Sequence, residues 1–423
     1  MQTKQGTIRA ALAYPAFRSL LAGLAVSQVG DWLYNVALVT LVYQRTGSAL
    51  WAGAATAARV VPMVVLGPLG GVLADRFDRR RLMVACDVIR LALMMALALV
   101  AAARLPVLIA PAIAALATVA STPYLPAVSA TTPRLVRDAD LPGANAARSA
   151  VTAAGIIAGP ALGGVLLLAG SPALAFAVNA LTFGVAAACA ATIRTSGAFT
   201  PSRTAGPRSA DAGHARLLSQ VAAGAAALRA YPAAVRLAGA DIVCSFIYGT
   251  QTVLLILVAR SAGLGLHGYG YLFAAIGAGG LIGTSLAGRA ARLPYRTALI
   301  AALALVGLPT LALPAAHWGP AAIVLAGLTG AGAIGVEIMT ETGLQRMLPE
   351  EVFGRAYGLA IPASIAGIAV GSLVAPVLAN SLGLTGALVA CGAAVFGYAA
   401  LLLRGAGSPA PAPVPARDSV LAG

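Results

Sequence analysis

Apolar residues along the chain form windows of about 20 residues, the length that a helix needs to cross the hydrocarbon core of a bilayer. Six windows precede residue 194 and six follow residue 230. They begin near Leu20, Ala49, Leu82, Leu105, Ala146, Pro172, Ala233, Gly268, Thr297, Gly319, Ala356 and Gly383. The pattern predicts an all-α polytopic membrane protein with twelve transmembrane helices in two six-helix, pseudo-symmetric halves.

The polar segments between and after these windows predict the domain organisation. Residues 194–230 are rich in Ser, Thr, Pro, Gly and Arg, which is typical of a linker, here a cytosolic one. Residues 405–423 are rich in Pro and Ala and are expected to be a disordered cytosolic tail. Residues 1–193 and 231–404 are then the N-terminal and C-terminal halves.

Composition and charge support this class. Hydrophobic residues make up 60% of the chain and charged residues only 10%, which is outside the range of soluble globular proteins. The net charge of +15 would indicate nucleic acid in a soluble protein, but here the arginines lie at helix ends, where they face anionic lipid. We expect a lipid bilayer as the partner and no nucleic acid.

The positive-inside rule gives the predicted orientation. Nearly all lysines and arginines fall on one side of the predicted map, and the exceptions are Arg45, Arg104 and Arg260. Both termini are therefore expected in the cytosol of a bacterial cell, with the chain in the inner membrane. No small-residue cleavage site follows a short apolar core near the N-terminus, so no removable signal peptide is expected.

A short charged hairpin, residues 67–81, separates the second and third windows. Gly67 and Gly71 are four residues apart and are expected to let another helix approach closely. Asp75 lies where the helix emerges, so it is expected to cap a neighbouring helix or pair with an arginine. The hairpin arginines place the loop in the cytosol; they are Arg76, Arg79, Arg80 and Arg81.

The hairpin resembles the loop between helices 2 and 3 of the major facilitator superfamily, through Gly71-x-x-x-Asp75-Arg76-x-x-Arg79-Arg80-Arg81. Asp78 stands where the family pattern usually has glycine. The resemblance implies that the loop gates the cytosolic side, with Gly71, Asp75, Arg76 and Arg80 as gating residues. The alternative is a plain topological anchor.

Asp87 and Arg90 follow the hairpin, three residues apart, and are predicted to pair on one helix face. We group them with the gating residues, although a structural role for the pair is favoured.

The two halves also repeat each other in sequence. Gly155-Ile-Ile-Ala-Gly159 and Gly367-Ile-Ala-Val-Gly371 are 212 residues apart, and an offset of 213 places Gly70 on Gly283. The same offset places Gly288 where Asp75 would be, which suggests that the gating chemistry is concentrated in the first half.

A second motif, Gly155-x-x-x-Gly159-Pro160-x-x-Gly163-Gly164, resembles the Gly-Pro motif of antiporter members of the superfamily. Gly155, Gly159, Pro160 and Gly163 are expected to form a bendable helix interface between the halves, with simple close packing as the alternative. Within the superfamily the chain most resembles the twelve-helix branch of macrolide-efflux and enterobactin-export proteins. The supporting patterns are Ser27-Gln28-Val29-Gly30-Asp31, Asp87-x-x-Arg90, Leu348-Pro349 and Gly354-Arg355.

Charged residues at membrane depth are costly and are therefore candidates for function. Asp31 is predicted near the bilayer midplane, and Gln28 and Asn35 share its helix face. These residues, with Asp241 as the repeat equivalent of Gln28, are the predicted substrate-binding set. Alternatively, Asp31 is a buried ion-pair partner of Arg90 or Arg59.

Glu337 and Glu341 lie one helical turn apart, and mutual repulsion and desolvation favour keeping a proton on at least one of them. Both are candidates for proton coupling, and Glu337 is preferred. Glu341 lies close to Arg346 and the cytosolic boundary, so a solvated or ion-paired helix end is its alternative role.

Enzyme function is disfavoured. The three histidines are scattered, and the sequence has no nucleophile elbow, zinc-protease motif or phosphate-binding loop. No cofactor or metal is expected. The sequence predicts a monomeric, proton-coupled secondary transporter that exports an amphiphilic small molecule, a drug or secondary metabolite, by alternating access. An importer of a small metabolite and a siderophore exporter on the same fold remain alternatives.

Overall fold

The computed structural model describes residues 6–169, 171–193, 199, 231–290, 293–348 and 350–404, and the regular elements in these ranges are helices. The first part of the chain forms α1 (Ile8–Ala11), α2 (Pro15–Thr46), α3 (Ala49–Arg76), α4 (Arg79–Ala102), α5 (Ile109–Ser121), α6 (Tyr124–Leu135), η1 (Asp138–Asp140), α7 (Leu141–Ala169) and α8 (Pro172–Thr192). The second part forms α10 (Pro232–Ser261), α11 (Gly268–Ala290), α12 (Tyr295–Ala312), η2 (Leu313–Ala315), α13 (Gly319–Met347) and α14 (Glu350–Arg404). The predicted tail and, apart from Phe199, the predicted linker lie outside the described residues.

Nine helical segments within the described ranges are long and apolar enough to cross a membrane. One of them joins α5 and α6, and another is the 46-residue stretch Leu359–Arg404 of α14. The protein is therefore a multi-pass, all-helical membrane protein.

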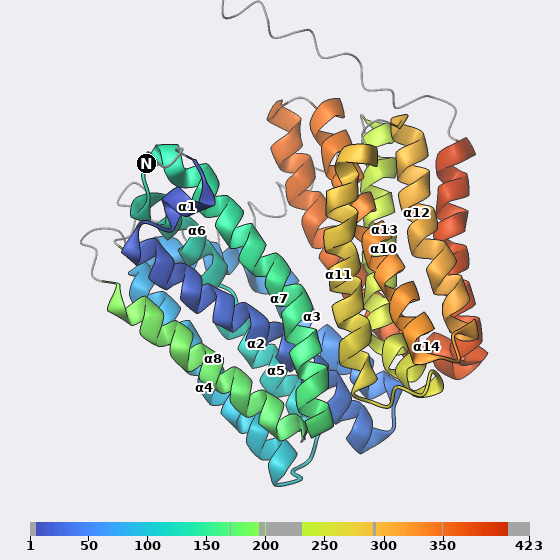
Figure 1. The fold of residues 1–423 in the computed structure, drawn as a ribbon, viewed down its shortest axis with the longest axis horizontal. Coiled ribbons are helices and arrows are strands. Elements are labelled where there is room, and N and C mark those ends of the chain that lie inside the picture. Colours follow the sequence, from blue (N-terminus) through green and yellow to red (C-terminus); the bar gives the residue numbers. More distant parts are fainter. Residues whose placement is uncertain are drawn as a thin grey trace, which may run out of the picture.

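The helices pack mainly with others from the same part of the chain. In the first part, α2 packs on α7 and α8, and α4 packs on α8 and α5. In the second part, α10 packs on α14, and α13 packs on α11 and α12. Contacts between the two groups run chiefly from α3 to α14 and from α7 to α11. Figure 1 shows the blue-to-green group beside the yellow-to-red group, and the two diverge towards the side of the marked N-terminus.

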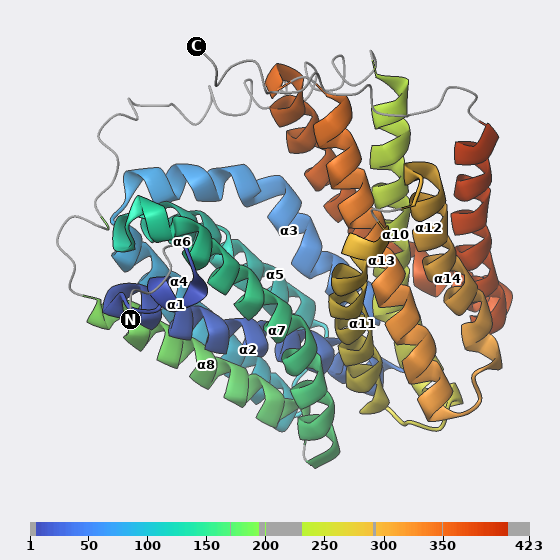
Figure 2. The same ribbon diagram turned by 45° about the horizontal axis from the view of Figure 1, so that its top comes forward.

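Glycine and proline set the breaks between helices. Gly47 ends α2 in the left-handed region, at φ 62°. Gly383, at φ 70°, interrupts α14 and separates its long first part from residues 384–404. The fourth predicted window is split into α5 and α6, because Pro123 has no N–H to continue the helix. Figure 2 shows α5 and α6 within the first group.

The expectation for Gly67 and Gly71 was wrong. A Cβ atom at either position would meet nothing within 4 Å in the described structure, so neither glycine accommodates a close neighbour. Gly70 does so instead, since its Cβ position lies 2.4 Å from the carbonyl oxygen of Thr122, at the break between α5 and α6. The close approach is therefore displaced by one residue, to another face of α3.

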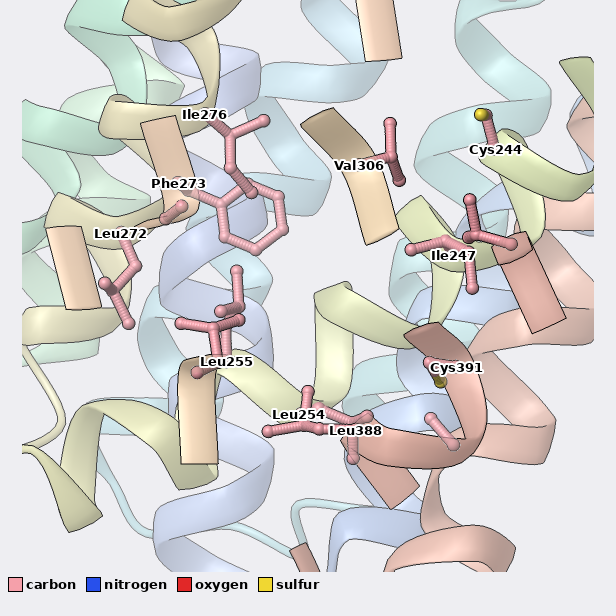
Figure 3. Packing of buried hydrophobic residues seen from close by; sticks show 14 of the residues in the cluster. Cys244, Ile247, Leu254, Leu255, Leu272, Phe273, Ile276, Val306, Leu388 and Cys391 are labelled. Carbon is pink, nitrogen blue, oxygen red and sulfur yellow. The ribbon is translucent and has the colours of Figure 1, made fainter. Parts of the chain in front are cut away.

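The largest hydrophobic cluster lies mainly in the second group of helices and extends to α2 and α3. Leu254 and Leu255 of α10, Phe273 of α11, Val306 of α12 and Leu388 of α14 are all buried in it. Figure 3 shows these side chains pointing into the space that their helices share. Dense packing of this kind fixes the helices that carry the polar residues described next.

Candidate functional site

A cavity of ≈ 530 Å³ lies beside this core. Its walls come from α10, α11, α13 and α14, together with Trp32 of α2 and with Ala153 and Ile156 of α7. Both groups of helices therefore contribute to it. Three carboxylates line it, Asp241, Glu337 and Glu341, and none of its described lining residues is lysine or arginine. The remainder of the wall is mainly apolar, so the cavity suits a ligand with an apolar body and a positive charge.

The two glutamates belong to α13 and lie on one face, as their spacing predicts. Both side chains are exposed. Glu341 accepts a hydrogen bond from Gln345 Nε2 at 3.5 Å. Within the described ranges no three His, Cys, Asp or Glu side chains gather as a metal site would require.

Asp241 reaches the cavity from α10. Ser364 Oγ of α14 donates a hydrogen bond to Asp241 Oδ2, at 2.5 Å. This bond holds the carboxylate at the wall and ties two helices together across it. Ser364 itself lines the cavity. A ligand that bonds to the Asp241 carboxylate in place of Ser364 would therefore break this contact between α10 and α14.

The other three predicted substrate-binding residues do not line this cavity. Asp31 accepts a hydrogen bond from Arg90, which is the pairing left open as its alternative. Asn35 accepts one from Arg59, whose guanidinium lies 4.8 Å from the centre of the Tyr34 ring. Gln28 packs against α7, with its Cβ 3.0 Å from the Cβ position of Gly155.

Asp31 nevertheless lies in the middle of α2, as the seventeenth of its 32 residues. Its ion pair with Arg90 joins α2 to α4. Arg90 also lies 3.8 Å from Asp87, and its guanidinium stacks 3.8 Å from the centre of the Phe183 ring of α8. The predicted pair Asp87 and Arg90 thus forms a three-residue cluster with the partly exposed Asp31.

The charged hairpin ties several helix ends together. Asp78 caps α4 by accepting a hydrogen bond from the backbone N–H of Arg81 at 2.9 Å. The buried Arg79 donates to the carbonyl oxygen of Ala130 in α6 at 3.1 Å. Arg80 donates to the carbonyl oxygen of Ile193, at the end of α8, at 3.0 Å. Asp75 lies in the last turn of α3, partly buried.

The glycine stripe of α7 lies against α2. The Cβ position of Gly159 is 2.3 Å from Trp32 Cβ, and that of Gly163 is 3.2 Å from Val36 Cβ. Another face of α7 meets α11, where the Cβ position of Gly270 lies 2.5 Å from the carbonyl oxygen of Pro160. The motif thus contributes to close packing within the first group of helices and also between the groups.

Sequence reasoning missed a contact between α2 and α10. Arg260 Nη1 donates a hydrogen bond to Tyr43 Oη at 3.0 Å, and the guanidinium lies 5.8 Å from the centre of that ring. Arg260 was noted as one of the few arginines on the outer side of the predicted map, and this was the only sequence signal for it.

A bundle of membrane-crossing helices around a ligand-sized cavity is the architecture that solute transporters use. The chain belongs to the transmembrane secretion effector family of the major facilitator superfamily, because the family's sequence profile matches residues 7–410. The predicted membership of the superfamily is therefore confirmed.

Curated relatives agree with this assignment. The MFS-type transporter YfiS of Bacillus subtilis is 28% identical over 394 residues, covering 89% of this chain and 91% of YfiS. The multidrug efflux pump Tap of Mycobacterium tuberculosis is 26% identical and covers 88% of each chain. Macrolide efflux protein A of Streptococcus pyogenes is 32% identical over 126 residues, covering 30% of this chain and 31% of that protein.

Among solved structures, the nucleoside transporter NupG superposes with a TM-score of 0.71 at 12% identity. The superposition covers 92% of this chain and 98% of NupG. At this level of identity the likeness concerns the fold alone.

Proposed function

We propose that the protein is a proton-coupled secondary transporter that exports amphiphilic, cationic small molecules by alternating access. The observation that carries the proposal is the mainly apolar cavity with three carboxylates and no described basic side chain in its wall. Apolar walls bind the body of such a molecule, and a carboxylate pairs with its positive charge. The efflux names of Tap and macrolide efflux protein A favour export over import.

The proposed membrane layout has twelve spans in two halves, residues 1–193 and 231–404. Counting α5 with α6 as one span, and the parts of α14 on either side of Gly383 as two, gives six spans in each half. Under this layout residues 194–230 are a cytosolic linker and residues 405–423 a cytosolic tail.

Equivalent glycines of the sequence repeat support pseudo-symmetry between the halves. Gly159 of α7 approaches the carbonyl oxygen of Val29 in α2, and its counterpart Gly371 of α14 approaches that of Phe246 in α10. Gly70 approaches Thr122, and its counterpart Gly283 approaches Ala331 of α13. In each case the paired helices occupy corresponding places in the two halves.

Topology is tested by labelling. Single cysteines placed at Ser209 in the linker and Ser419 in the tail of a cysteine-free variant should be protected from an impermeant thiol reagent in intact cells. Both should react once the membrane is opened. A cysteine at Arg104, on the predicted outer side, is the matched control and should react in intact cells. Labelling of the linker or tail in intact cells would overturn the orientation.

In this conformation the cavity is proposed to face the cytosol. Its lining on α13 runs from Gly330 to Leu344, towards the helix end that the arginine pattern assigns to the cytosol. On the opposite side the halves are held together by Arg260 with Tyr43 and by Gly270 against Pro160. Export then requires these outer contacts to open while the cytosolic ends close.

The hairpin is proposed to stabilise the closed cytosolic side, with Asp75 accepting hydrogen bonds from an opposing helix end. Asp75→Asn should therefore lower turnover by about 10-fold or more while leaving the amount of folded protein unchanged. Transport in vesicles and fluorescence-detected size exclusion measure the two quantities. Asp78→Asn is the matched control, since Asn also caps a helix, and it should transport normally. Normal turnover of Asp75→Asn would leave the hairpin as a topological anchor.

The main test uses inverted membrane vesicles and a panel of lipophilic cations and matched neutral analogues. A proton gradient with the vesicle interior acidic should drive accumulation of the cations inside the vesicles. Dissipating the gradient should abolish this accumulation. Accumulation unaffected by the gradient, or no cation transport, would reject the proposal. Loss of substrate already in the vesicles when the gradient is imposed would support an importer instead.

A further inference from the structure

The cluster of Asp31, Asp87 and Arg90 is not part of the cavity wall. Asp87 is the most enclosed of the three, with its side chain 0% exposed, against 8% for Arg90 and 30% for Asp31. It belongs to α4, which packs on α8, α5 and α6 and is joined to α2 by the ion pair of Arg90 with Asp31. A carboxyl in such a place must be paired, hydrogen-bonded or neutral.

No hydrogen bond in the described ranges stabilises the buried carboxyl of Asp87. Neither Oδ1 nor Oδ2 accepts one from any group in the described ranges, although both atoms are buried. The guanidinium of Arg90 is 3.8 Å away, beyond hydrogen-bonding distance, and is instead bonded to Asp31. Asp87 therefore lacks the hydrogen bonds that would stabilise its ionised form.

The charged groups around Asp87 also favour its neutral form. The charged groups that act on Asp87 are Arg90 of its own helix and Asp31 of α2, and Tyr124 of α6 and Cys86 are the other titratable groups beside it. Arg59 of α3 donates to Asn35 and is bonded to neither carboxylate, so two ionised carboxylates would share the one guanidinium of Arg90. Asp31 is the hydrogen-bonded partner of Arg90 and is the more exposed acid, whereas Asp87 has only the longer contact of 3.8 Å, so Asp87 is the less compensated carboxyl.

We propose that Asp87 is a proton-binding site separate from the cavity, neutral in this conformation, which ionises when Arg90 turns from Asp31 to Asp87. Loss of the proton leaves a carboxylate 3.8 Å from Arg90, which can close on it by a small rotation. Asp31 then loses its partner at the middle of α2. The proton thus determines whether Arg90 joins α2 to α4, and this goes beyond the proposed function because it does not depend on what the cavity carries.

Infrared difference spectroscopy of the purified protein in lipid nanodiscs tests the proposal. Near neutral pH the wild type should show the carbonyl band of a protonated carboxylic acid, and Asp87→Asn should lose the intensity of one carboxyl per chain. Asp31→Asn should lose the same band, because Arg90 is then free to pair with Asp87. Asp78→Asn, at the partly exposed helix cap of the hairpin, is the matched control and should keep it.

Thermal unfolding of the same variants provides the second measurement. Asn resembles a neutral aspartic acid in shape, so Asp87→Asn should fold and should melt within a few degrees of the wild type. Retention of the band in Asp87→Asn, or failure of that variant to fold, would overturn the proposal, since the latter means that an ionised Asp87 is needed. Retention of the band in Asp31→Asn would reject the exchange of Arg90. None of these outcomes depends on transport, so they are distinct from failure of cavity-based export.

Discussion

Replacing Glu337 by Gln should abolish uphill export while leaving downhill flux of the same cation in place. Glu337 lines the cavity one turn from Glu341 and shares the wall with Asp241. If export exchanges a proton on Glu337 for the substrate, a permanently neutral side chain uncouples the two. The accumulation ratio in inverted vesicles should then fall to about one, because a carrier without coupling only equilibrates its substrate.

The controls for this prediction are the two neighbouring acids. Glu341→Gln should retain gradient-driven export, since Glu341 lies nearer the cytosolic end of α13 and already accepts a hydrogen bond from Gln345. Asp241→Asn should weaken cation binding, because it removes the charge while Ser364 can still bond the remaining oxygen. Unchanged uphill export by Glu337→Gln would move the coupling role to one of these acids.

Much of the fold could be predicted because membrane helices carry strong local signals. α3, α8, α11 and α13 begin at the residues where the apolar windows begin. Pro172 occupies the first turn of α8 and Pro320 that of α13, where proline is favoured. The left-handed Gly383 likewise lies at the start of the last predicted window.

The candidate site was harder to predict because periodicity fixes the faces of one helix relative to each other, but not to the neighbouring helices. Gln28, Asp31 and Asn35 were grouped as one polar face of α2, but they meet α7, α4 and α3 respectively, and it is Trp32 that lines the cavity. Adjacent residues point about 100° apart on a helix, so an error of one position changes the neighbouring helix entirely. The displacement from Gly71 to Gly70 has the same cause.

Glu337 and Asp241, which do line the cavity, carry a different signal in the sequence. Charged residues in an apolar window have few environments available to them, and a cavity is one of these. Asp31 shares that signal but is explained by Arg90, which lies on α4 and is 59 residues away in the sequence. No local pattern distinguishes an acid that meets a ligand from one that meets such a distant partner.

Replacing Gly270 by Ala should shift the protein away from the conformation described here. The Cβ of an alanine would lie 2.5 Å from the carbonyl oxygen of Pro160 and 2.6 Å from the backbone nitrogen of Gly164. Both atoms belong to the backbone of α7, so the two helices must separate where the halves meet on the proposed outer side. Overpacking of this kind costs on the order of 1–3 kcal/mol.

This cost applies only while α7 and α11 are in contact. It should therefore shift the conformational equilibrium constant roughly 5- to 150-fold in favour of the outward-open state. Labelling of a cysteine at Ala262, buried at the end of α10, should become faster in the Gly270→Ala variant. Gly397→Ala is the matched control, because a Cβ there meets nothing within 4 Å in the described structure, and it should leave labelling unchanged. If Gly270→Ala also left it unchanged, the contact between α7 and α11 would not be one that opens during transport. Faster labelling without loss of thermal stability would identify this glycine contact as part of the closure on the outer side.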